Sequence, residues 1–241
     1  TYALWTAIAP SPSYSINRRN TSLTIGPHTN GSIGVACASG EQMLGGGYTL
    51  SDHLLSPYAS YPSAINVWRV NARSGATSLT IGVYALCLAA NFPIQAQIHT
   101  VTGDVSGYLD VPCPSGTTAT AGGFSIAIGS QIDEMIQLGS SWEMQATPSG
   151  TGTAYAICAI GMVHEPNPTA DFNDTGDQTR TVSCPSSYKL IGGGFHYGGF
   201  PFPWYQDYPA PDAAHWTVSA VETSSMEPPT ANGSCDWFNP F

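Results

Sequence analysis

The chain repeats one pattern three times. Each copy has a cysteine, then seven residues, then a tetrad of one small residue, two glycines and one aromatic residue: Cys37 with residues 45–48, Cys113 with residues 121–124, and Cys184 with residues 192–195. A tryptophan and a second cysteine follow each tetrad: Trp68 and Cys87, Trp142 and Cys158, Trp216 and Cys235. Such internal similarity decides the architecture before any local motif does. We therefore predict a single domain, residues 1–241, of three repeats over about residues 21–95, 96–165 and 166–241.

The composition favours an all-β fold. Only 9% of the residues are charged, against about 25% in typical domains, and the chain holds 26 glycines and 19 prolines. Each repeat has four segments of strand character: one before the first cysteine, one at the tetrad, one at the tryptophan and one at the second cysteine. Twelve strands predict a pseudo-threefold, β-prism-like body of three four-stranded sheets, with a β-trefoil-like fold as the alternative. Tandem glycines predict bulges or close backbone approaches where three sheets crowd around an axis.

All six cysteines belong to the repeat pattern. Six cysteines allow 15 pairings, but the repeat symmetry favours one disulfide within each repeat: Cys37–Cys87, Cys113–Cys158 and Cys184–Cys235. Disulfides indicate an oxidising compartment. The disulfides therefore predict a secreted, extracellular protein, and because the sequence shows no signal peptide we expect the chain to be the mature form.

Two repeats resemble a known family in this pattern. Cys113-Pro114 with Gly123-Phe124, and Cys184-Pro185 with Gly194-Phe195, are similar to the vitelline membrane outer layer protein family. The resemblance implies a β-prism with internal disulfides. The repeat lengths differ, so it bears on architecture only.

The first residues copy part of the repeats. Residues 2–5 resemble residues 84–87 and 155–158, which end in Cys87 and Cys158. This likeness predicts a thirteenth strand over residues 2–9 that pairs with the sheet of the third repeat, whose own last segment, residues 233–238, is weak. The pairing would bury Trp5, within one molecule or between two. Residues 10–20 then read as a linker rich in Pro and Ser.

Aromatic residues in the loops give the strongest functional hint. Residues 200–208 read as an exposed aromatic loop, and exposed aromatic faces beside polar groups bind sugars or protein partners. The tryptophans Trp68, Trp142 and Trp216 read instead as core, because they occupy equivalent apolar strand positions. The predicted ligand-binding residues are Trp204, Tyr205, Gln206, Asp207, Tyr208, Tyr58 and Tyr61.

Three weaker signals complete the set of candidate sites. Asp171, Asn173 and Asp177 imitate the first half of a calcium loop, but Val182 stands where the last acidic ligand belongs. The acidic pairs Asp133/Glu134 and Asp207/Asp212 fit glycoside hydrolysis, with solubilising surface charge as the alternative. Four asparagines begin N-x-S/T sequons: Asn20, Asn30, Asn173 and Asn232.

The charge balance narrows the partners. A net charge of −10 with six Lys plus Arg argues against nucleic acid and anionic membranes, which need basic patches. No run approaches the roughly 18 apolar residues of a membrane span. We expect a secreted, non-catalytic, lectin-like protein that contacts a glycan or an extracellular surface, with no cofactor unless calcium binds. The alternative is a self-assembling extracellular subunit, in a filament, coat or matrix, that uses residues 2–9; a glycoside hydrolase is a distant third.

Overall fold

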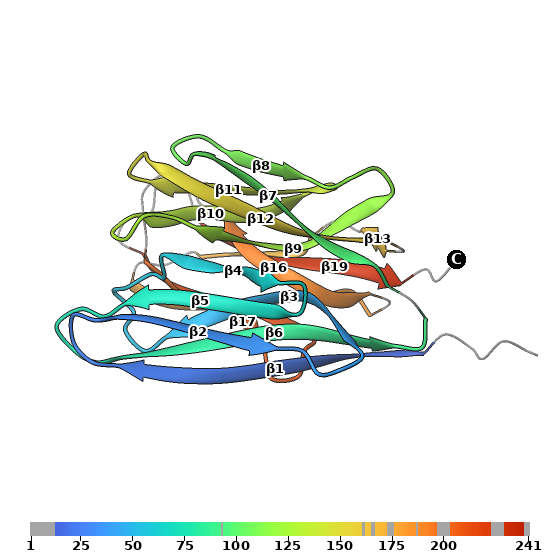
Figure 1. Ribbon diagram of the computed structural model, residues 1–241, viewed down its shortest axis with the longest axis horizontal. Helices are drawn as coiled ribbons and strands as arrows, with labels where there is room; N and C mark the ends of the chain where they lie inside the picture. Colours follow the sequence, from blue (N-terminus) through green and yellow to red (C-terminus); the bar gives the residue numbers. More distant parts are fainter. Residues whose placement is uncertain are drawn as a thin grey trace, which may run out of the picture.

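The computed structural model describes residues 13–92, 94–160, 162–164, 167–172, 176–186, 188–196, 203–222 and 229–238. In this part of the chain the long regular segments are all β-strands, as the composition predicted. The strands run along the long axis of the body and form three antiparallel sheets (Figure 1). Among the described residues no helix is long and apolar enough to cross a membrane.

The three sheets are built alike, each from six or seven strands. Sheet A contains, in order, β1 (Tyr14–Ile25), β6 (Leu79–Ala90), β3 (Glu41–Leu50), β17 (Trp204–Pro209), β18 (His215–Glu222) and β15 (Gly176–Ser183). Sheet B contains β2 (Asn30–Ala36), β5 (Val67–Arg73), β4 (Ala59–Ala64), β9 (Thr117–Ser125), β12 (Thr151–Ile160) and β7 (Ala96–Asp104). Sheet C contains β13 (Met162–His164) and β14 (Thr169–Asp171), both beside β19 (Thr230–Phe238), then β16 (Lys189–His196), β10 (Gln131–Leu138), β11 (Ser141–Thr147) and β8 (Leu109–Pro112).

Every sheet combines strands from two repeats. The first repeat places β3 and β6 in sheet A but β4 and β5 in sheet B. The second repeat divides in the same way between sheets B and C, and the third between sheets C and A. The seams are the pairings of β4 with β9, β10 with β16, and β17 with β3. This cyclic exchange closes the body on itself.

The prediction of four strands per sheet was wrong, because the sheets have six or seven. One missed set, β4, β10 and β17, lies between each tetrad and its tryptophan. The other set, β1, β7 and the pair β13 and β14, precedes the first predicted strand of each repeat. Proline conceals strands of the first set: Pro62 lies in β4 and Pro209 ends β17, and proline in a segment argues against a strand.

The tetrads explain how three sheets approach one axis. A β-bulge precedes each tetrad at the same place, at Leu44, Thr120 and Ile191. The first residues of the tetrads meet at the axis: a Cβ added to Gly45 would lie 2.8 Å from the Cβ of Ala121. The predicted bulges and close approach are therefore confirmed.

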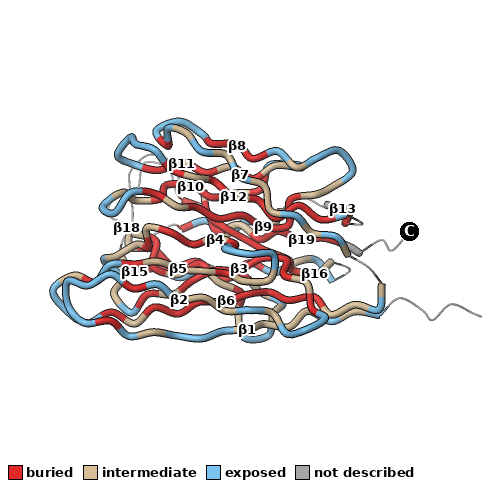
Figure 2. Tube along the Cα trace, viewed as in Figure 1, coloured by how far each residue is buried: buried red, intermediate tan, exposed pale blue. Residues whose placement is uncertain are grey.

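The middle glycine of each tetrad accommodates the tryptophan of the same repeat. A Cβ added to Gly46, Gly122 or Gly193 would overlap the indole ring of the tryptophan that packs on it. All three tryptophans are fully buried, as predicted: Trp68, Trp142 and Trp216. Figure 2 shows long buried stretches in inner strands such as β6 and β12, whereas the edge strand β1 and the connections are mainly intermediate or exposed.

The three disulfides join the predicted cysteines. Each disulfide also joins two different sheets. Cys37 follows β2 of sheet B, and its partner Cys87 lies in β6 of sheet A. The equivalent bonds join sheet C to sheet B through Cys113–Cys158 and sheet A to sheet C through Cys184–Cys235. We call the end where they lie the disulfide end, and the opposite end, which carries residues 51–58 and 126–130, the loop end.

The N-terminal part departs from the prediction. Residues 2–9 lie outside the described residues, so their pairing stays a prediction. The expected linker is wrong from Tyr14 onward, since β1 begins there and pairs with all of β6. The last strand of the third repeat, β19, pairs with β16 on one side and with β13 and β14 on the other.

Candidate binding site

The aromatic segment of the third repeat is a strand, and its side chains split between two faces. Trp204 is fully buried, with its ring stacked on Phe195 at a centroid distance of 4.1 Å. Tyr205 is 9% exposed and Asp207 is fully buried. The prediction that these three residues form an exposed contact loop is wrong, because β17 lies between β3 and β18 in sheet A, where all three side chains are buried.

Tyr208 and Tyr61 instead lie partly exposed on the faces that point away from the core. Tyr208 meets Tyr84 with ring centroids 5.0 Å apart, and we call these two residues tyrosine pair A. Tyr61 stacks on Tyr155 at 4.9 Å, and these two form tyrosine pair B. Pair A crosses the seam between β17 and β3, and pair B crosses the seam between β4 and β9.

The glycine at the third position of the first and second tetrads makes these pairs possible. Gly47 pairs with Tyr84 on one side and lies against the backbone of Tyr208 on the other. Gly123 has the same place between Tyr155 and Tyr61. Because neither glycine has a side chain, two rings from neighbouring strands can lean together above it.

Sheet C offers an internal comparison. At the equivalent seam, Gly194 pairs with Asn232 and lies against the carbonyl of Met135, which Ile136 follows. Ile136 and Asn232 therefore stand where the other two sheets carry tyrosines. Since sheet C forms with those residues, the fold does not require a tyrosine pair.

Polar groups surround the pairs. The hydroxyl groups of Thr49 and Tyr84 lie 3.3 Å apart. Gln206, a predicted ligand residue, accepts a hydrogen bond from the Ser219 hydroxyl at 2.9 Å on the same face. Beside pair B, the hydroxyls of Thr102 and Thr153 are 2.9 Å apart. Each pair thus combines aromatic carbon with hydroxyl groups, as sites for polar ring-shaped ligands do.

Tyr58 lies apart from the pairs, in a pocket at the loop end. The pocket has a volume of about 350 Å³ and lies between the connections of residues 51–58 and 126–130. Its wall includes Leu54 and Ile128, which are 64% and 47% exposed, together with Arg73 and Gln131.

Two buried carboxyl groups have strongly raised pKa values. Burial raises the pKa of Asp207 to about 8, although the Trp216 indole N–H, which donates to it at 2.6 Å, opposes the shift. Burial also raises the pKa of Asp236 to about 8. Asp207 is therefore mostly protonated inside the core at neutral pH and is not positioned as a ligand contact.

The acidic pairs have different surroundings. Asp133 is 6% exposed and accepts a hydrogen bond from the Thr147 hydroxyl, and burial raises its pKa. Glu134 is 2% exposed, with its Oε2 2.7 Å from Nδ1 of His196. Asp212 is far more exposed than Asp207: its Oδ2 lies 2.5 Å from Nδ1 of His215, and the Ala214 amide N–H lowers its pKa. Asp207 and Asp212 thus share no common site.

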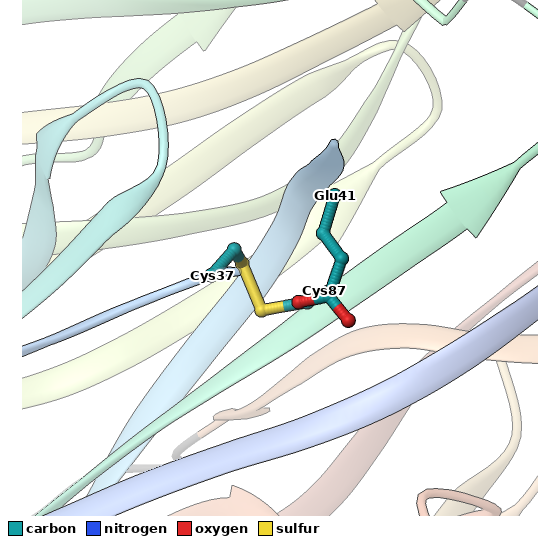
Figure 3. Close-up of side chains that lie close together, drawn as sticks. All are labelled: Cys37, Glu41 and Cys87. Carbon is teal, nitrogen blue, oxygen red and sulfur yellow. A yellow bond between two sulfur atoms is a disulfide. The ribbon is translucent and has the colours of Figure 1, made fainter. Parts of the chain in front are cut away.

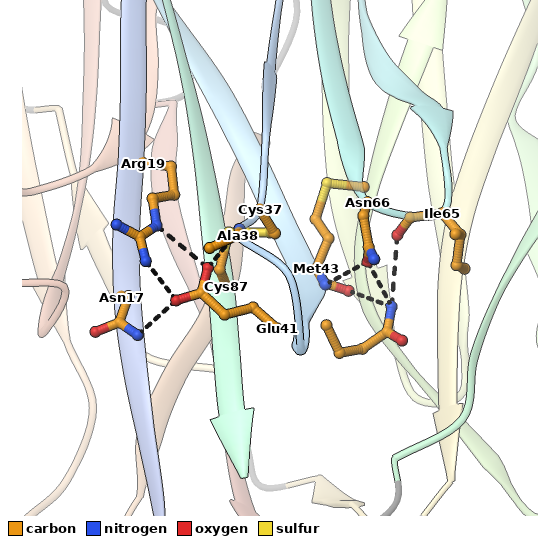
Figure 4. The surroundings of a disulfide bond; sticks show 10 residues. Asn17, Arg19, Cys37, Ala38, Glu41, Met43, Ile65, Asn66 and Cys87 are labelled. Atoms are coloured by element: carbon orange, nitrogen blue, oxygen red, sulfur yellow. Dashed lines mark hydrogen bonds and ion pairs between the residues drawn. A yellow bond between two sulfur atoms is a disulfide. The ribbon is translucent and has the colours of Figure 1, made fainter.

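One cluster contains the residue types of a metal site, but two of its three members form a disulfide bond. Figure 3 shows the Glu41 carboxylate close to Cys37 and Cys87. The two sulfurs are bonded to each other. Glu41 accepts hydrogen bonds from Arg19, Asn17 and the Ala38 amide N–H, and the Arg19 contact is the main reason that its pKa is lowered (Figure 4). These contacts fix the turn that precedes β3.

The calcium and glycosylation predictions remain untested. Asp171 uses its backbone carbonyl to accept from Arg180, and Asp177 accepts from the Tyr205 hydroxyl. Asn173 lies outside the described residues. Asn20 and Asn30 are exposed and Asn232 is partly exposed, so the first two are accessible as sequons.

The sequence signal for the tyrosine pairs was present but was interpreted differently. Tyr84 and Tyr155 occupy the same position three residues before Cys87 and Cys158. That recurrence indicated a strand, and only the register shows that it also places a second ring beside Tyr208 and Tyr61.

No protein family model and no curated protein matches this sequence.

Proposed function

We propose that the protein is a secreted, non-catalytic binding protein that holds sugar chains at tyrosine pairs A and B. The observation that carries the proposal is their recurrence at equivalent seams of two sheets, while sheet C builds the same seam with Ile136 and Asn232. Because the fold does not require the tyrosine pairs, we attribute them to ligand binding. The three disulfides are typical of proteins in oxidising, extracellular surroundings.

The chemistry of the pairs suits sugar rings. A sugar presents apolar C–H faces and hydroxyl edges, and tyrosine offers an apolar ring with a polar end. The rings of both pairs are partly exposed, and threonine and serine hydroxyl groups lie at nearby positions of the sheets. Two sites on different sheets give one molecule two points of attachment, which increases avidity for a polymer.

The test replaces each pair by the residues that sheet C already carries. One variant combines Tyr84→Asn with Tyr208→Ile, and another combines Tyr155→Asn with Tyr61→Ile. On a panel of immobilised polysaccharides, each variant should bind the recognised sugar more weakly by about 2 kcal/mol at its own site. The variant with all four substitutions should not bind.

Ile136→Val on sheet C is the matched control, because it lies at the equivalent seam without a tyrosine. It should bind like the wild type. Unchanged binding by the four-residue variant, or failure of the wild type to bind any sugar on the panel, would refute the proposal.

A second candidate function is end-to-end assembly into an extracellular polymer. Among the described residues, the exposed large apolar side chains all lie at the two ends of the body. Leu54, Tyr108 and Ile128 lie at the loop end, and Ile65, Leu138 and Ile160 lie at the disulfide end. Two apolar ends suit head-to-tail contacts between molecules, which form open filaments where the arrangement does not close into a ring. Electron microscopy of the protein with and without Leu54→Asp and Ile128→Asp tests this: filaments should form only without the substitutions.

A further inference from the structure

Basic side chains are scarce in this protein, yet two of them lie at the tyrosine pairs. The chain has six Lys plus Arg against sixteen Asp plus Glu. Arg18 lies beside pair A, and Arg69 lies beside pair B.

Arg18 rests on pair A. Its guanidinium carbon is 4.4 Å from the centre of the Tyr84 ring and 5.9 Å from that of Tyr208. Its Nε is buried and has no acceptor, and no described carboxylate pairs with it. The next residue, Arg19, is by contrast bound to Glu41 at 2.5 Å. Arg18 is therefore a cation held beside two rings, and none of the described carboxylates forms an ion pair with it.

Arg69 has the corresponding role at pair B from another strand. It lies in β5 directly opposite Tyr61 in the register. Its one hydrogen bond to a described residue runs from Nη1 to the Ser32 hydroxyl at 3.0 Å. A guanidinium has five N–H donors, so most of them remain for a ligand.

Sheet C again provides the comparison. Opposite Ile136, in the place that Arg69 has opposite Tyr61, stands Glu143, which faces Asp110 in the next strand. Burial and the nearby Asp110 and Glu134 raise the pKa of Glu143. The seam without tyrosines is therefore acidic, while both seams with tyrosines carry an arginine.

We infer that the two tyrosine pairs recognise acidic sugars, in which a ring carries a carboxylate. This rests on the proposed function and names its substrate class. The rings would take the apolar face of the sugar, and Arg18 or Arg69 would donate to its carboxylate, as guanidinium groups do in planar recognition. The net charge of −10 repels anions at long range. The preference therefore comes from contacts shorter than the screening length of about 8 Å at physiological ionic strength.

The experiment compares one sugar in two charge states. The probes are an oligogalacturonide with free carboxylates and the same oligomer as its methyl ester, titrated into the full chain by calorimetry. The free acid should bind the wild type about tenfold more tightly, as expected for hydrogen bonds between charged groups. In the double variant Arg18→Gln with Arg69→Gln the two forms should bind alike. Lys189→Gln, at the disulfide end, makes a charge change of the same sign and should keep the preference.

Each other outcome has a clear consequence. Equal binding of both forms by the wild type, abolished in the four-tyrosine variant, overturns this inference and leaves the proposed function standing. A preference for the acid that survives Arg18→Gln with Arg69→Gln also overturns it, as does equally tight binding of a glutamate-rich peptide. Binding of neither form overturns the inference, and the polysaccharide panel then decides the proposed function separately.

Discussion

Three side chains at one equivalent position decide how each buried tryptophan is hydrogen-bonded. Ser60 accepts from the indole N–H of Trp68 at 3.0 Å, and Asp207 accepts from that of Trp216 at 2.6 Å. Met135 occupies the place in the second repeat, and the indole N–H of Trp142 has no acceptor among the described residues. The same core thus tolerates a hydroxyl, a thioether or a carboxyl group, at different energetic cost.

Asp207 makes the free energy of unfolding depend on pH. Its pKa is about 8 in the folded chain, against 3.8 when exposed. Between these values the folded state keeps a proton that the unfolded state has lost, so stability falls as the pH rises from about 4 to about 8.

Asp207→Ser, which copies Ser60, should keep the bond to Trp216 and remove this loss. We expect it to raise the free energy of unfolding at pH 8 by on the order of 2 kcal/mol, with a much smaller effect at pH 4. Urea unfolding at the two pH values measures it, and Asp236 should leave a residual pH dependence in the variant. An equal effect of the substitution at both pH values would contradict the account.

At the scale of elements, the tetrad strands β3, β9 and β16 do most to organise the fold. Their first residues meet at the axis, and their second residues, all glycine, accommodate the tryptophans. The third-position glycines of β3 and β9 also lie beneath the tyrosine pairs. The same four-residue pattern thus contacts the axis, a tryptophan and, in two repeats, a tyrosine pair. These packing constraints account for its recurrence with little variation.

Gly193→Ala tests the middle position. The added methyl group would overlap the Trp216 indole, which is fully buried. Overpacking of this kind costs about 1–3 kcal/mol of unfolding free energy. Gly107→Ala is the control, since a Cβ there meets nothing within 4 Å. Equal urea midpoints for the two variants would show that the tetrads do not limit packing.

The sequence was most informative where residues recur with the same neighbours. The tetrads, the tryptophans and the cysteine pairs all repeat, and each was predicted in its correct role. β17 was not predicted, because Trp204, Tyr205 and Tyr208 resemble a loop in composition, and only pairing with β3 and β18 separates the two buried rings from the outward one. The tyrosine pairs also depend on contacts between repeats, which a pattern within one repeat does not contain.

At the scale of the whole molecule, the disulfides and the seams close the same ring of sheets. Each disulfide ties two sheets at one end, and each seam joins two repeats toward the other. Because the sheets are shared, no repeat can leave the body without opening two seams. This arrangement favours cooperative unfolding.

Replacing Cys113 and Cys158 by alanine removes one of these ties. The bond spans a sequence separation of 45 residues, and its loss should lower the free energy of unfolding by about 4 kcal/mol. Non-reducing urea unfolding measures the change, and the remaining two disulfides should keep the fold. A loss below about 1 kcal/mol, well under the usual range, would mean that the seams alone hold the sheets together.

The central claim, two equivalent sugar sites at the tyrosine pairs, is tested most directly by binding stoichiometry. Calorimetric titration with a short oligomer of the recognised sugar should give two sites per chain for the wild type. It should give one site for Tyr84→Asn with Tyr208→Ile and one for Tyr155→Asn with Tyr61→Ile. A single site in the wild type, or two sites that survive in either variant, would contradict the account.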